Sequence, residues 1–152
     1  MSRTNTIVGK AGKRRPADLP SPFPVDLSLL SAGALKKHLL SRYQLTAPID
    51  CRYFARGLND TYEVTAGRRR FYLRVYRHKR QSLKTIQAEI DLLEFLAAHG
   101  LRAALALKDR RGEAMHLIQA PEGPRPAVIF AAAPGEYIAA PEYDQCAQLG
   151  AL

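Results

Sequence analysis

The stretch Phe71-Tyr-Leu-Arg-Val-Tyr76 and the segment 82–99 that follows it decide the fold of this chain. Successive side chains of a β-strand point to opposite faces, so the first stretch predicts a strand with two different faces. One face carries Phe71, Leu73 and Val75, and the other carries Tyr72, Arg74 and Tyr76. Arg74 therefore projects from the middle of an otherwise apolar strand.

Residues 82–99 carry apolar side chains at helical spacing, and Glu89 falls within this stripe rather than opposite it. The stripe consists of Ile86, Ile90, Leu93, Leu96 and Ala97. An unpaired buried charge costs several kcal/mol. The pattern therefore predicts that Glu89 of the helix pairs with Arg74 of the strand, which holds a cation suited to binding phosphate.

The remaining elements follow from apolar spacing and turn residues. A helix is expected from Ser31, a suitable N-cap, and the helix at 82–99 is expected to end at Gly100. Further strands are predicted at 51–56, 61–65, 103–108, 114–119 and 127–130, with turns at 57–60 and 109–112, a loop at 121–126 and a last helix at 141–152. The order β-β-β-α-β-β-β predicts an α+β fold with one antiparallel sheet and one packed helix.

Length and composition favour a single domain. The chain has 152 residues, 47% of them hydrophobic, and no apolar run approaches the roughly 18 residues that cross a bilayer. The basic N-terminus lacks the apolar segment of a secretory signal, so no membrane association and a cytoplasmic location are expected. Cys51 and Cys146 lie far apart and in no Cys/His cluster, which suggests neither a metal site nor a disulfide framework.

The charge distribution bears on possible partners. Residues 1–24 are polar, basic and rich in proline, which predicts a disordered leader. The formal net charge of +9 comes largely from this leader and from basic clusters at 68–70 and 77–80, which are typical of solvated surface. Nucleic acid is an alternative partner that we do not expect, because aromatic side chains are not interleaved with the basic runs.

A glycine-containing turn precedes the strand that carries the cation. Gly57 has no side chain, so backbone N–H groups of the turn can approach phosphate oxygens, whose charge Arg74 can neutralise. A turn glycine and an Arg–Glu pair also occur as purely structural features. It is their order and spacing along the chain that favours a nucleotide site.

At these residues the sequence resembles the aminoglycoside phosphotransferase and choline kinase-like family, whose fold is that of the protein kinases. The resemblance runs from about residue 35 to 152, corresponds to the N-terminal lobe, and rests on segments 57–64, 71–77, 86–93, 120–125 and 127–135. It implies that a loop covers the nucleotide, that Arg74 replaces the family's phosphate-binding lysine, and that Glu89 is its partner. The implied loop consists of Gly57, Leu58, Asn59, Asp60 and Thr61. Tyr72 is implied to stack on adenine, and the implied hinge begins with Phe130, Ala131 and Ala132.

The resemblance also sets what this chain is expected to lack. The family's catalytic loop and the aspartate that holds Mg²⁺ belong to a C-terminal lobe that would follow Leu152, so ATP is the implied cofactor and Mg²⁺ is expected only with that lobe. Asp109, His116 and Asp144 are unsuited to those roles and are expected to be solvated side chains.

Together these patterns predict a leader at 1–24, a kinase-like nucleotide-binding N-lobe at 25–135, and a hinge with the start of a truncated C-lobe helix at 136–152. The expected function is that of an ATP-dependent phosphotransferase, a small-molecule kinase, inactive as this chain alone. The expected partners are a nucleotide and a second chain that covers apolar surface at the hinge. A non-catalytic nucleotide-sensing or docking module remains the alternative.

Overall fold

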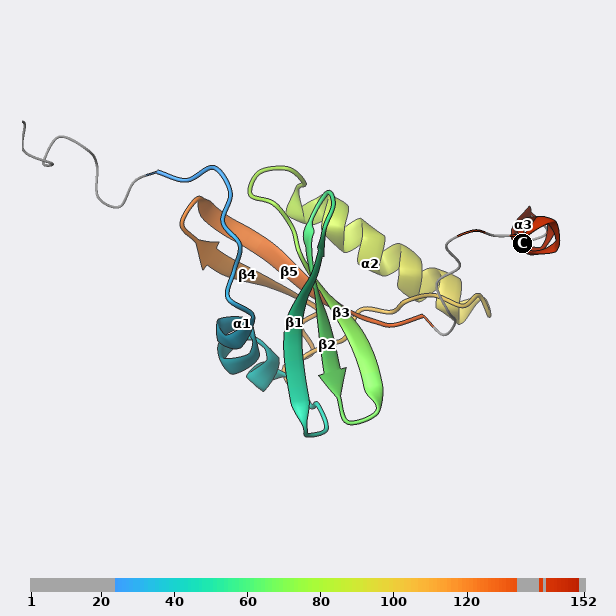
Figure 1. Cartoon of the computed structure of the whole chain (residues 1–152), viewed down its shortest axis with the longest axis horizontal. Helices are drawn as coiled ribbons and strands as arrows, with labels where there is room; N and C mark the ends of the chain where they lie inside the picture. Colours follow the sequence, from blue (N-terminus) through green and yellow to red (C-terminus); the bar gives the residue numbers. More distant parts are fainter. Residues whose placement is uncertain (1–23, 134–139, 141, 151–152) are drawn as a thin grey trace, which may run out of the picture.

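The computed structural model describes residues 24–133, 140 and 142–150. Within them, five strands form one antiparallel sheet in the order β1-β2-β3-β5-β4, with α1 on one face and α2 on the other (Figure 1). The elements are α1 (Ala32–His38), the 3₁₀ helix η2 (Leu40–Arg42), β1 (Ile49–Arg56), β2 (Asp60–Ala66), β3 (Arg69–Val75), α2 (Leu83–Ala98), β4 (Met115–Ala120), β5 (Gly123–Ala131) and α3 (Tyr143–Gly150). The predicted α+β class with one antiparallel sheet is confirmed.

Strand β3 lies at the centre of the sheet and has the two faces that its sequence predicts. Phe71, Leu73 and Val75 are at most 2% exposed and belong to the core on the α1 side. On the opposite face, Ile86 and Ile90 of α2 are buried in a second core cluster. That cluster also contains Tyr76, Val128 and Phe130. The alternation along β3 therefore separates two apolar layers.

The helix boundaries follow from their caps. The hydroxyl of Ser82 accepts a hydrogen bond from the Thr85 N–H at 3.1 Å, and Ser31 caps α1 in the same way through the Ala34 N–H at 3.3 Å. Gly100 follows α2 with a φ of +82°, a conformation that glycine adopts without strain. The predicted starts of both helices and the end of α2 are confirmed.

Two predictions about the second half of the sheet are wrong. Residues 103–108 form only one isolated bridge, between Ala106 and Phe130, because β4 occupies most of the edge of β5 that they approach. The predicted loop at 121–126 is mostly strand, since β5 begins at Gly123 and the carbonyl of Pro126 accepts the Tyr76 N–H at 2.8 Å. The observed order is therefore β-β-β-α-β-β.

Three other expectations concern the ends and the surface. Arg68, Arg69 and Arg70 are exposed, as expected, and α3 occupies much of the helix predicted at 141–152. The leader predicted at 1–24 falls outside the described residues except for Pro24, as does the hinge segment around residues 134–139. No helix among the residues placed by the structure is long and apolar enough to span a membrane.

The two cysteines should differ in reactivity. Both are free, but Cys51 is buried and Cys146 is exposed on α3. Burial is the largest cause that raises the pKa of the Cys51 thiol to about 11, and the thiolate is the reactive form. We expect a thiol reagent at pH 8 to label Cys146 rapidly and Cys51 only in denaturant, as peptide mass spectrometry would show. Cys146→Ser should abolish the rapid phase, and rapid labelling of native Cys51 would contradict its burial.

Candidate functional site

The predicted contact between the strand cation and the helix carboxylate is present. Arg74 Nη1 lies 2.5 Å from Glu89 Oε1, and the hydroxyl of Tyr76 donates to Glu89 Oε2 at 3.0 Å. The side chains of Arg74 and Glu89 are 39% and 34% exposed, so the pair is open to solvent on one side. It is thus accessible to a ligand as well as held in place.

Glu89 reaches the sheet because its neighbours anchor the helix. Ile86 and Ile90 are 0% and 1% exposed, and they fix the face of α2 that contacts the sheet. Glu89 lies between them in sequence and faces β3, where Arg74 projects on the same side. The apolar packing of α2 therefore sets the position of the carboxylate.

Arg74 is surrounded by groups that favour its charged form. Its guanidinium carbon lies 4.9 Å from the ring centre of Phe130 and 5.9 Å from that of Tyr76. Burial lowers the pKa of Arg74, but the hydrogen bonds and charges of Tyr76 and Glu89 outweigh burial and raise it overall. Burial is also the main cause that raises the pKa of Tyr76 to about 12. Arg74 is therefore a permanent cation beside a neutral hydroxyl.

The ion pair and the glycine turn line one cleft. Its volume is about 510 Å³, within the range of about 300–1,000 Å³ that small-molecule pockets occupy. The lining residues are Ala55, Arg56, Gly57, Leu58, Asn59, Thr61, Arg74, Tyr76, Gln81 and Glu89. Four of the five residues of the predicted nucleotide-covering loop thus meet Arg74 and Glu89 at the same cavity.

Gly57 is not required by the turn itself. Its φ is not positive, and a Cβ atom added to it would meet no atom within 4 Å. Its N–H donates to the Asn59 carbonyl at 3.1 Å, and Arg77 Nη2 donates to the Gly57 carbonyl at 2.8 Å. Neither backbone strain nor crowding explains this glycine, and close approach of a ligand to the turn is the reason that remains from the sequence analysis.

Asp60 has a different position from the rest of the predicted loop. It is the first residue of β2, its side chain is 0% exposed, and it does not line the cleft. Its carboxylate accepts from Arg56 Nε and Arg125 Nη2, each at 2.8 Å. Asp60 therefore holds the end of the turn in place from the interior.

The residues predicted to contact a base lie on β3 and β5. Tyr72 pairs with Phe130 across the two strands, and its ring lies 5.4 Å from that of Phe54. Phe130 is 5% exposed. The N–H groups of Ala131 and Ala132 already donate to the carbonyls of Leu105 and Arg70. These two hinge residues therefore have no backbone donor left for a base edge.

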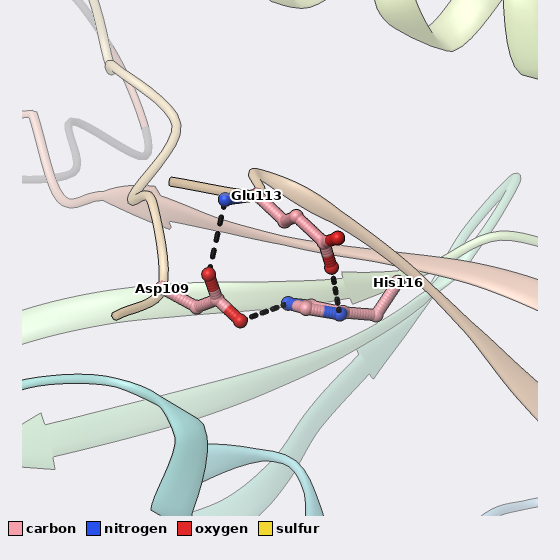
Figure 2. A group of neighbouring side chains, drawn as sticks. All are labelled: Asp109, Glu113 and His116. Carbon is pink, nitrogen blue, oxygen red and sulfur yellow. Dashed lines mark hydrogen bonds and ion pairs between the residues drawn. The ribbon is translucent and has the colours of Figure 1, made fainter. Parts of the chain in front are cut away.

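The expectation of solvated side chains is wrong for Asp109 and His116 and confirmed for Asp144. The first two are 9% and 5% exposed, whereas Asp144 is exposed on α3. Asp109 Oδ1 accepts the N–H of Arg111 at 2.8 Å. It also accepts the N–H of Glu113 at 3.0 Å, as Figure 2 shows. These bonds hold the Asp109 carboxylate toward the interior. In the sequence, only the short spacing of Asp109, Glu113 and His116 indicated that these side chains lie together.

The pKa values of Asp109 and His116 are both lower than usual. Burial raises the pKa of Asp109, but its bonds to the backbone N–H groups of Glu113 and Arg111 and the charge of Arg42 lower it overall. Burial and the charge of Arg42 lower the pKa of His116. An ionised Asp109 and a neutral His116 are therefore the favoured forms at neutral pH.

Comparison with known proteins places this geometry in a family. The model of the family described as "Phosphotransferase enzyme family" matches residues 50–152. An uncharacterized protein of Synechocystis is 35% identical over 79% of this chain and 36% of its own length. A Deinococcus radiodurans protein is 35% identical over 82% of this chain and 38% of its own length. The homoserine kinase of Phenylobacterium zucineum is 27% identical over 74% of this chain and 33% of its own length.

Two solved structures share the fold. An amicoumacin kinase in complex with AMP-PNP, Ca²⁺ and its ligand has a TM-score of 0.58 and 24% identity, over 70% of this chain and 32% of that one. A microcompartment-associated aminopropanol kinase has a TM-score of 0.55 and 22% identity, over 74% of this chain and 34% of that one. The chain therefore spans about a third of the length of these relatives. With the match over residues 50–152, it belongs to the phosphotransferase enzyme family.

Proposed function

We propose that the cleft between the turn at 57–59 and the Arg74–Glu89 pair binds the phosphates of ATP. The observation that carries this proposal is the ion pair itself, which lines the same cavity as a glycine that the fold does not require. Among the described residues, Arg74 uses only Nη1 for hydrogen bonds, which leaves Nε and Nη2 for phosphate oxygens. Glu89 fixes the guanidinium, and the turn covers the phosphates with its backbone N–H groups.

The base is proposed to lie along the same face of the sheet, toward the end of β5. Tyr72 and Phe54 offer exposed or half-exposed rings there, and aromatic faces stack on nucleobases. The Phe130 ring supports the Arg74 guanidinium, whose carbon lies 4.9 Å from the ring centre.

For phosphate transfer, we propose that this chain supplies the ATP-binding part and that the catalytic part corresponds to further sequence, which the longer relatives possess. The relatives named as kinases act on small molecules such as homoserine and aminopropanol, which suggests a small-molecule acceptor for the complete enzyme. The catalytic base and the Mg²⁺-binding aspartate would belong to that further part, which would also cover apolar surface near the hinge. The 152-residue chain is thus proposed to work in the cytoplasm, binding ATP without transferring phosphate by itself.

Thermal unfolding of the chain with and without Mg-ATP tests the proposal. A ligand that binds only the folded state stabilises it by about 2.7 kcal/mol at 100 times its dissociation constant, so the melting temperature should rise. We expect Arg74→Ala to abolish this rise. Arg70→Ala is the matched control, because Arg70 is an exposed arginine of the same strand paired with Glu63, and it should keep the response. An equal rise in Arg74→Ala would refute the proposed role of Arg74.

A further inference from the structure

The carboxylate that fixes Arg74 is itself open to solvent. The side chain of Glu89 is 34% exposed, and that of Arg74 is 39% exposed. Ion pairs at such positions contribute little, because water screens the charges and both side chains lose rotamer freedom when one geometry is held. Packing of α2 brings the backbone of Glu89 to the sheet but does not select its rotamer. A further contact is needed to keep the carboxylate against Arg74.

Tyr76 supplies a contact of this kind from the interior. Its hydroxyl donates to Glu89 Oε2 at 3.0 Å, while Arg74 Nη1 donates to Glu89 Oε1 at 2.5 Å. Arg74 Nη1 also donates to the Tyr76 hydroxyl, over 3.5 Å. Among the side chains that the structure describes, Glu89 has no other hydrogen-bond partner. Each oxygen of its carboxylate thus has one partner of its own, and the three side chains close a set of mutual contacts.

Tyr76 is held in place by its surroundings. Its side chain is 1% exposed and packs in the cluster that contains Ile86 and Ile90 of α2. Its backbone N–H donates to the Pro126 carbonyl at 2.8 Å, and its own carbonyl accepts from Arg125 Nε at 2.9 Å. Because burial is the main cause that raises the pKa of Tyr76 to about 12, the hydroxyl keeps its proton at neutral pH. Tyr76 is therefore a rigid donor aimed at a mobile type of side chain.

We propose that Tyr76 is the positioning residue that keeps Glu89 against Arg74 and so prepares the cleft for phosphate before the nucleotide arrives. This inference rests on the proposed function of the cleft. A ligand that meets an already oriented cation does not have to order it on binding, which lowers the cost of association. Without the hydroxyl, Glu89 can rotate into solvent and Arg74 loses its orientation. Tyr76 thus acts through Glu89 rather than on the nucleotide.

The affinity of the whole chain for Mg-ATP, measured by isothermal titration calorimetry, tests this role. Tyr76→Phe removes the hydroxyl and keeps the buried ring. We expect it to weaken Mg-ATP binding about three- to tenfold, the effect of losing one hydrogen bond. In a Glu89→Ala background, Tyr76→Phe should cause no further loss, because the group that it positions is absent. A merely structural role would lower the affinity by the same factor in both backgrounds.

Tyr62→Phe is the matched control. It also removes a buried hydroxyl, since Tyr62 is 0% exposed and donates to the Leu30 carbonyl at 2.7 Å. Tyr62 belongs to the core cluster on the α1 side and does not line the cleft. Tyr62→Phe should therefore lower the urea midpoint of unfolding and leave the affinity for Mg-ATP unchanged.

The outcomes separate this inference from the proposed function. Equal Mg-ATP affinity in Tyr76→Phe and the parent, or an equal further loss in the Glu89→Ala background, would overturn the role of Tyr76. A parent chain that does not bind Mg-ATP would instead refute the proposed function. Urea unfolding then still tests the contact, because Tyr76→Phe should lower the midpoint in the parent more than in Glu89→Ala. Equal shifts of the midpoint would show that Tyr76 does not hold Glu89.

Discussion

Replacing Arg125 with alanine is expected to lower the free energy of unfolding by about 3–5 kcal/mol. Arg125 and Asp60 are both 0% exposed, and Arg125 Nη2 lies 2.8 Å from Asp60 Oδ2. Removing one partner of a buried ion pair leaves the other charge without full compensation. Among the side chains that the structure describes, Asp60 would keep only Arg56 as a charged partner, and the Arg56 side chain is 39% exposed.

The cost is large because Arg125 also joins separate segments. Its guanidinium donates to the carbonyls of Ser28, Val75 and Tyr76, at 2.8, 3.2 and 2.9 Å. It thereby connects the segment before α1, the end of β3 and the start of β2. The same side chain lies 3.4 Å from Glu122 in the turn between β4 and β5. Its loss would leave buried carbonyls unpaired as well as a carboxylate.

Urea unfolding measures this effect. Arg80→Ala, an exposed arginine on the loop before α2, should change the free energy by less than about 0.5 kcal/mol. The double variant Asp60→Ala with Arg125→Ala should cost less than the sum of the single variants, because it leaves neither member of the pair unmatched. A loss below about 1 kcal/mol in Arg125→Ala would mean that the buried pair contributes little to folding.

The Arg74–Glu89 contact could be predicted from the sequence because each half of it is a local signal. An alternating strand and a helical stripe each fix which face a side chain occupies, and the two charges were out of place on those faces. The observed separation of 2.5 Å follows from packing of α2 on β3. Local periodicity therefore sufficed where both partners lie on regular elements.

The role of Arg125 could not be found in this way. The segment Pro121-Glu-Gly-Pro-Arg-Pro126 is typical of a loop by composition, yet β5 begins at Gly123 and buries Arg125 completely. Its partners Asp60 and Ser28 are 65 and 97 positions away in sequence, and no local pattern indicates such contacts. The burial of Asp109 and His116 was missed for the same reason, since a tight turn and the distant Tyr43 and Arg42 enclose them.

Replacing Ile90 with alanine is expected to weaken both the core and the proposed nucleotide site. Ile90 is 1% exposed in the cluster beneath α2, and truncating a buried isoleucine to alanine costs about 2–5 kcal/mol. Because Glu89 is the adjacent residue, loosening the helix should also release the carboxylate from Arg74. We expect a lower melting temperature and, in addition, a smaller rise with Mg-ATP.

Leu92→Ala separates the two effects. Leu92 lies on the same helix but is 55% exposed, so its truncation removes a similar side chain without disturbing the packed face. Urea unfolding should give a loss well below that of Ile90→Ala, and Mg-ATP should raise the melting temperature as in the parent. A full Mg-ATP response in Ile90→Ala would mean that Arg74 is held without the packed helix. The guanidinium would then depend on its contacts with Phe130 and Tyr76 rather than on Glu89.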